Sequence, residues 1–280
     1  MARIKTSACS ANYGRADLFE VVDRLAEHGF DGVEITVMYH AVPDSTSLQR
    51  REEIKRYVRG KGLEISALHF IFPGGMKMTA DDHGERTRIA DHMGSVLELA
   101  ADLEAPVVVV GGGGVRSLPE DVDREEALAR VFGIYEDTMR RGEKLGVVAG
   151  FEALNRYETN LGFTLEECCA YVDRIGSPAL KVVGDTFHMN IEEASLPAAV
   201  EKAGPKLAHL HLPDSHRLAP GEGHIDFPPI FEALRKIGYS GYVSFEFFSI
   251  SPQLWYLPTF EACDSEVAKG LDHLRKSGLV

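Results

Sequence analysis

Short apolar runs alternate with longer amphipathic stretches along the chain, and this alternation predicts the fold. The apolar runs are rich in valine and isoleucine, as buried strands are, and the stretches between them repeat apolar residues at helical spacing. The expected strands cover residues 4–10, 31–37, 63–70, 106–112, 147–152, 181–185, 207–212 and 242–248. The expected helices cover residues 16–29, 46–60, 82–103, 123–145, 164–175, 196–203, 228–237 and 260–276. Strict alternation of strands and helices predicts an α/β protein built as a single (β/α)8 barrel.

Composition narrows the class of protein further. The chain has 280 residues without a linker or low-complexity segment, so we expect one domain over residues 1–280. An excess of 43 acidic over 30 basic residues gives a net charge of −13, which argues against a nucleic-acid partner. The four cysteines form no CxxC pair, so a disulfide framework is not expected. No long apolar run or leader-like segment is seen, which predicts a cytoplasmic protein without membrane contact.

Polar residues stand at the carboxyl ends of four successive expected strands. They are two glutamates, an aspartate and a histidine, spaced by 26 to 35 residues: Glu152, Asp185, His211 and Glu246. Since one strand, loop and helix takes about 30 residues, these side chains should meet at one face of the barrel. A single carboxylate there is as often a helix cap or ion-pair partner, but four buried charges together need a cation. Three carboxylates and one imidazole suit Mn²⁺, Co²⁺ or Mg²⁺, so we expect one divalent ion per chain.

Other residues near these strand ends allow more than one interpretation. On the seventh strand, His211 is the expected ligand, and His209 is expected to pack in the barrel or to support the ligands. His188 follows Asp185 by three residues and is either a site residue or a loop cap. Glu158 and Arg217 lie in loops at the same face, where a lone charge is ordinarily solvated. The glycine run 111–114 either cradles a phosphate or forms a plain turn, and it is not a P-loop.

Several motifs of the second half resemble one known family. FEALNRYETN, GDTFHMNIEE, HLPDSHRLAPGEGHIDF and the glutamate of FEFF look like the xylose-isomerase-like TIM-barrel superfamily, and most like its ketose 3-epimerases. The resemblance is strong over residues 147–248 and only architectural before them. It implies one divalent ion, usually Mn²⁺ or Co²⁺, held by Glu152, Asp185, His211 and Glu246. It also implies that the two glutamates exchange the substrate proton.

The resemblance further implies residues that hold the sugar and an oligomeric state. Residues matching the contacts to O1–O3 of the sugar are Glu158, His188 and Arg217, and Phe248 matches an aromatic that packs on the distal carbons. We also assign His69, which ends the third strand, to substrate binding. A homodimer or homotetramer is implied, and residues 255–258 are a candidate interface or lid. The chain departs from ketose epimerases at 112–114, where these commonly carry an aromatic, so the sugar specificity stays open.

Two glutamates on strands five and eight favour one reaction. If both flank the sugar, one removes the C3 proton of a ketose, giving a cis-enediolate, and the other returns a proton on the opposite face, which is epimerisation. If only one glutamate acts, the outcome is aldose–ketose isomerisation. We therefore predict an isomerase acting on a small sugar, with Glu152 and Glu246 as acid and base.

Three alternatives remain at this stage. One is another enzyme of the same barrel, such as an inosose dehydratase, a hydroxypyruvate isomerase or a 3-oxo-sugar-processing enzyme. A second is a nuclease of the endonuclease IV type with three zinc ions, for which His69, His188 and His224 are possible ligands. Against it, the fourth strand ends in glycine where that family has histidine. The third is a catalytically silent, sugar-binding barrel.

Overall fold

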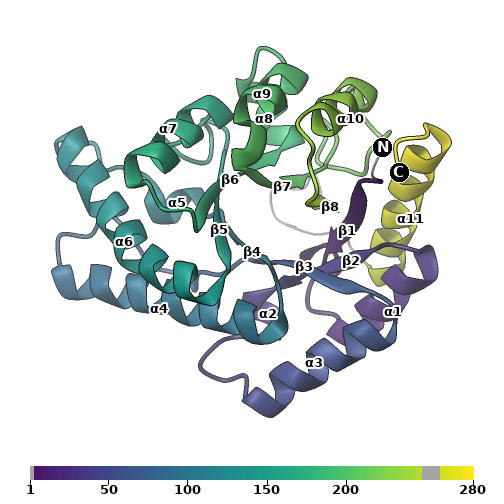
Figure 1. Cartoon of the computed structure of the whole chain (residues 1–280), viewed down its shortest axis with the longest axis horizontal. Coiled ribbons are helices and arrows are strands. Elements are labelled where there is room, and N and C mark those ends of the chain that lie inside the picture. Colours follow the sequence, from purple (N-terminus) through teal and green to yellow (C-terminus); the bar gives the residue numbers. More distant parts are fainter. Residues whose placement is uncertain (1–2, 248–258) are drawn as a thin grey trace.

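Eight parallel strands close into a barrel with helices around it (Figure 1). In this computed structural model the described residues are 3–247 and 259–280. The strands pair in chain order, and β1 pairs with β8 to close the ring. Their bounds are β1 Lys5–Cys9, β2 Gly32–Thr36, β3 Glu64–His69, β4 Val107–Val110, β5 Val148–Glu152, β6 Leu180–Asp185, β7 Leu207–His211 and β8 Tyr242–Phe245. The predicted (β/α)8 barrel is therefore confirmed.

The eight expected helices are present, with bounds within two residues of those predicted. They are α1 Leu18–His28, α3 Leu48–Gly60, α4 His83–Leu103, α6 Arg124–Leu145, α7 Leu165–Ile175, α9 Leu196–Ala203, α10 Phe227–Lys236 and α11 Phe260–Lys276. The structure adds short helices that were not predicted: α2 Val37–His40, α5 Gly113–Arg116, α8 Thr186–Glu192 and the 3-10 turns Ser10–Tyr13 and Gly204–Lys206. They are too short for helical periodicity to reveal them.

Side-chain caps fix where the long helices begin. Asp17, Asp82 and Asp123 each accept a hydrogen bond from a backbone N–H in the first turn of α1, α4 and α6, respectively. These bonds satisfy N–H groups that have no partner within the helix. Gly29 ends α1 in a left-handed conformation, with φ of 81°. The caps therefore fix the residue at which each helix begins after the loop that follows its strand.

The apolar core has two parts. The larger lies between the strands and the helices, and a small cluster fills the barrel interior with Ala67, Val107, Val109 and Val183. Gly150 permits this filling, because a Cβ there would lie 2.3 Å from the Cγ2 atom of Val183. Because this small apolar cluster fills the barrel interior, the polar side chains gather above it, at the carboxyl ends of the strands. None of the described helices has the length and apolar character needed to cross a membrane.

Candidate metal and active site

The four residues predicted to hold a metal meet at the carboxyl ends of β5 to β8. Their ligand atoms lie within 4.8 Å of one another, and all four side chains are buried. The Nδ1 atom of His211 lies 2.9 Å from Oε1 of Glu152, 3.2 Å from Oε2 of Glu246 and 3.9 Å from Oδ2 of Asp185. Three carboxylates and an imidazole nitrogen that converge in a buried space can hold a divalent metal ion.

Without a cation, these ligands perturb one another strongly. Burial raises the pKa of Asp185 to about 7. For Glu246, burial favours a higher pKa, but the attraction of His211 and His69 outweighs it and the net pKa falls well below the ordinary value. Burial alone would lower the pKa of His211, but the combined attraction of Glu246, Glu34 and Glu152 raises it well above the ordinary value. A proton on His211 thus compensates part of the charge that a metal ion would neutralise.

Arg217 supplies a fixed positive charge beside the four ligands. Its Nη1 atom donates to Oδ2 of Asp185 over 3.2 Å, and Nη2 donates to Oε2 of Glu246 over 3.1 Å. The guanidinium also lies over the ring of Phe187, 4.8 Å from its centroid. Residue 217 adopts a left-handed backbone conformation, with φ of 57°. Arg217 therefore contacts two of the carboxylates that were predicted to bind the metal, and it also lines the cavity described below.

His188 and Glu158 lie at the same face, joined by Asn155. The Nδ1 atom of His188 accepts from the backbone N–H of Asn155, and the Asn155 amide donates to Glu158 over 3.0 Å. Burial, reinforced by the charge of Arg217, lowers the pKa of His188 well below its ordinary value, so its ring is neutral. Nε2 of the same ring lies 3.2 Å from Nη1 of Arg217, which can only donate, so N–H donors face both nitrogens of the ring. His188 and Arg217 are thus held side by side at the wall of the cavity.

A cavity of about 360 Å³ opens over the cluster, a size suited to a small ligand. Its polar lining includes Glu152, Glu158, His188, Arg217 and Glu246. Its apolar lining includes Phe70, Ile71, Phe72 and Leu154, together with the glycine run. A ligand that has both oxygen-rich and apolar parts matches this mixed lining.

The glycine run after β4 is explained by close packing against the site. A Cβ on Gly111 would lie 2.4 Å from Oε2 of Glu152 and 3.4 Å from Nε2 of His69. A Cβ on Gly113 would lie 2.3 Å from the carbonyl oxygen of Glu158. The run therefore lets the loop approach the strand-five residues closely, and the helical turn α5 begins within it.

Sequence reasoning gave Glu34 no role, although it lies at the centre of the hydrogen-bond network. Glu34 is fully buried in the middle of β2, and its Oε2 atom accepts from Nε2 of His209 over 2.9 Å. Its Oε1 atom lies 3.1 Å from Nε2 of His211 and 3.0 Å from Nδ1 of His69. A carboxylate that binds Nε2–H of His211 leaves Nδ1 of that ring free for a metal ion. The sequence signal was a lone charge inside a buried apolar strand.

Arg116 is a second residue that was missed. It is buried and donates to the backbone carbonyls of Val110, Glu152 and Leu161, and its guanidinium packs on the ring of Phe151, 4.3 Å from the centroid. These bonds tie the ends of β4 and β5 together directly beneath Glu152. Nothing in the sequence around Arg116 distinguishes it from an exposed loop arginine.

The remaining sequence assignments have different outcomes. His209 is buried and supports Glu34, as expected of a residue behind the ligands. His224, considered as a nuclease ligand, is exposed and bonds to Ser215 rather than joining the buried cluster. Phe248 and residues 255–258 lie outside the described part of the chain.

Comparison with known proteins identifies the family. The family model described as xylose isomerase-like TIM barrel matches residues 22–277. The chain belongs to this family. It is 35% identical to a D-psicose 3-epimerase of Enterocloster bolteae over 81% of this chain and 75% of that protein. It is 28% identical to the 3-dehydro-D-guloside 4-epimerase of Escherichia coli over 82% of this chain and 87% of that one.

Solved structures give the same result. The crystal structure of D-psicose 3-epimerase with D-tagatose from Clostridium cellulolyticum H10 superposes with a TM-score of 0.84 and 27% identity, covering 98% of this chain and 99% of that one. These relatives are epimerases, so the predicted family and the predicted enzyme class, an isomerase, are confirmed.

Proposed function

We propose that the chain is a divalent-metal-dependent epimerase that inverts C3 of a ketose or related keto-sugar. One observation carries this proposal: Glu152 and Glu246 line the same cavity, and a carboxylate oxygen of each lies within 3.2 Å of Nδ1 of His211. Relatives named D-psicose 3-epimerase and L-ribulose 3-epimerase support it.

The proposed ligands of the metal ion are Glu152, Asp185, His211 through Nδ1, and Glu246. Their hard oxygen donors suit Mn²⁺ best, and also Co²⁺ and Mg²⁺. When bound, such an ion supplies Lewis-acid polarisation of the substrate carbonyl, which acidifies the neighbouring C–H.

The two glutamates move the proton. One carboxylate removes hydrogen from C3, leaving a cis-enediolate, and the other delivers a proton to the opposite face of the same carbon. Contact with the metal ion would hold both carboxylates ionised until a proton arrives, as a base requires. Arg217 and His188 orient the sugar from the cavity wall, and Glu158 accepts from a hydroxyl. His69 faces the cavity, and Phe248 is proposed to pack on the distal carbons.

Turnover in D₂O tests the proposal. The purified protein loaded with Mn²⁺ would be incubated with a panel of ketoses, ketose phosphates and inososes, and the position of deuterium read by NMR. We expect deuterium at C3 together with inversion there, and loss of inversion by about 10²–10⁴ in Glu152→Gln or Glu246→Gln. Label at C1 would identify an aldose–ketose isomerase instead. Cleavage of abasic DNA with no labelled sugar would establish the nuclease alternative.

A second candidate is an epimerase of 3-oxo-sugars. The relative from Escherichia coli is a 3-dehydro-D-guloside 4-epimerase, and glycines 112–114 leave the cavity wall without a bulky side chain. A 3-oxo substrate would take up deuterium at C2 or C4, the carbons beside its carbonyl, which separates it from a ketose. The single domain over 1–280, the cytoplasmic location and the homodimer or homotetramer remain predictions, and gel filtration tests the last of them.

A further inference from the structure

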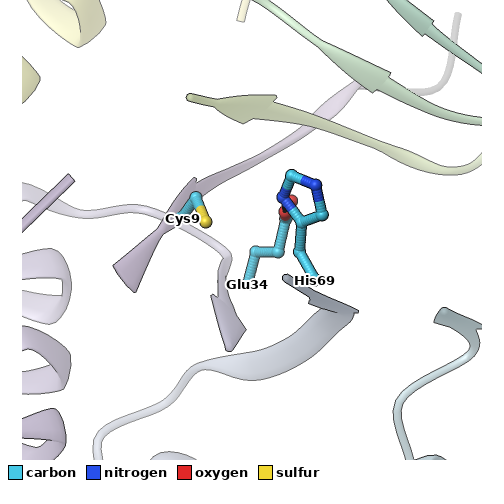
Figure 2. A group of neighbouring side chains, drawn as sticks. All are labelled: Cys9, Glu34 and His69. Atoms are coloured by element: carbon cyan, nitrogen blue, oxygen red, sulfur yellow. Dashed lines mark ion pairs between the residues drawn. The ribbon is translucent and has the colours of Figure 1, made fainter. Parts of the chain in front are cut away.

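A second group of metal-binding side chains lies on the other half of the barrel mouth. Cys9 ends β1, His69 ends β3 and Glu34 lies in the middle of β2, and the three side chains point toward one another (Figure 2). All three are buried, and one ligand atom from each lies within 4.8 Å of the other two. The proposed reaction gives no role to Cys9 or Glu34, so this grouping needs another explanation.

The imidazole of His69 gives the first argument for a cation. Its Nδ1 atom lies 3.0 Å from Oε1 of Glu34 and 3.1 Å from Oε1 of Glu246, yet it makes no hydrogen bond of acceptable geometry. In a tetrahedral site with metal–ligand bonds of about 2.0–2.1 Å, neighbouring ligand atoms lie about 3.3 Å apart. The spacing around Nδ1 is therefore close to that of ligands around a shared ion.

The surroundings of Glu34 give the second argument. Among the described residues, the groups hydrogen-bonded or ion-paired with this buried carboxylate are the imidazoles of His69, His209 and His211. Arg217 is engaged with other carboxylates instead. Once His211 binds a metal ion through Nδ1 its ring is neutral, and a fully buried carboxylate then lacks a fixed positive partner. Either a proton on a neighbouring imidazole or a second cation must compensate it.

The carboxylate of Glu246 connects the two groups. Its Oε2 atom faces His211 and Arg217, and its Oε1 atom faces His69. A carboxylate whose two oxygens face two ligand sets is the usual bridge of a site with two metal ions. The same residue can therefore serve both groups without rearrangement of the chain.

We propose that Cys9, Glu34 and His69 bind a second divalent cation, with Glu246 as the bridging ligand. The ligand atoms are Sγ of Cys9, Oε1 of Glu34 and Nδ1 of His69, and the thiol proton leaves to solvent when the ion binds. A thiolate and an imidazole select Zn²⁺, Co²⁺ or Fe²⁺ over Mg²⁺ and Ca²⁺. This site goes beyond the proposed function and does not depend on which sugar is the substrate.

Cobalt is a suitable probe, because sulfur ligation has an optical signature. The metal-free full-length protein would be titrated with Co²⁺, following bound metal by mass spectrometry and the thiolate-to-cobalt charge-transfer absorption in the near ultraviolet. We expect two equivalents and a strong charge-transfer band in the wild type. Cys9→Ser should bind one equivalent without the band. Cys168→Ser is the matched control, since Cys168 is equally buried but lies on α7, and it should keep both.

Asp185→Asn separates this site from the proposed active site. Asp185 belongs only to the first group, so this variant should lose the first equivalent but keep the charge-transfer band. One equivalent of Co²⁺ without a band in the wild type would overturn the proposal and leave a protonated imidazole as the partner of Glu34. A second equivalent and band that persist in Cys9→Ser would also overturn it. The wild-type measurement decides even if Cys9→Ser fails to fold.

Discussion

Replacing Gly111 by alanine tests whether the position of the Glu152 carboxylate determines the rate. The backbone of Gly111 is not in the left-handed region, so alanine introduces no conformational strain there. Its Cβ would lie 2.4 Å from Oε2 of Glu152, whereas ordinary contacts begin at 3.4 Å. The carboxylate must therefore move by about 1 Å, and displacement of a reacting group by that amount costs about 10²-fold in rate. We expect kcat/KM of Gly111→Ala to fall by about that factor.

The assay is epimerisation of the substrate found by the deuterium experiment, with bound metal measured in the same samples. Gly114→Ala is the control in the same loop, because its Cβ would meet no atom within 4 Å. In Gly114→Ala, kcat/KM should fall several-fold at most. The difference between the two variants separates displacement of Glu152 from general stiffening of the loop. Equal losses in both variants, or a Gly111→Ala enzyme with wild-type kcat/KM, would refute the reasoning.

Three further predictions concern stability. Mn²⁺ at 100 times its dissociation constant should raise the free energy of unfolding of the wild type by about 2.7 kcal/mol. Asp185→Asn, in which the asparagine can still cap the helix, should gain little stability from Mn²⁺ in thermal unfolding. Arg116→Met leaves three buried carbonyls without their donor and should lower the free energy of unfolding, measured in urea, by about 3 kcal/mol. Tyr157→Phe, at a side chain that is 82% exposed, should leave it unchanged. Burial lowers the pKa of His40 from 6.5 to about 4, so the unfolded chain binds the extra proton between these values and stability falls as pH falls. Between pH 7 and 5 the wild type should therefore lose about 2 kcal/mol more than His40→Gln, and equal losses would contradict the assignment.

The fold could be predicted from the sequence because the barrel repeats one local pattern. Each strand is a short apolar run and each long helix an amphipathic stretch, so neither prediction needs contacts distant in the chain. The residues at the ends of β5 to β8 were recognisable for the same reason. Glu152, Asp185 and His211 each terminate an apolar run, and Glu246 directly follows one, where the topology alone assigns the position.

The parts that could not be predicted depend on pairing between distant segments. Glu34 stands in the strand GVEIT, and only the closed barrel brings it to His209 and His211, which lie 175 and 177 residues away. Arg116 reaches Glu152 and Leu161 from a four-residue helix that periodicity does not reveal. Such interactions are set by the register of the closed ring, which the local pattern of any single strand does not contain.

The arrangement of the barrel mouth explains why a glycine, Gly111, follows β4. Seven strands, or in β8 the residue directly after the strand, bring cysteine, acidic or histidine side chains to the barrel mouth: Cys9, Glu34, His69, Glu152, Asp185, His211 and Glu246. The strand β4 instead leads into Gly111, and the cavity opens beside it. A side chain at this position would occupy the space of the Glu152 carboxylate. The glycine therefore lets the loop approach the Glu152 carboxylate closely and leaves this part of the cavity wall without a side chain.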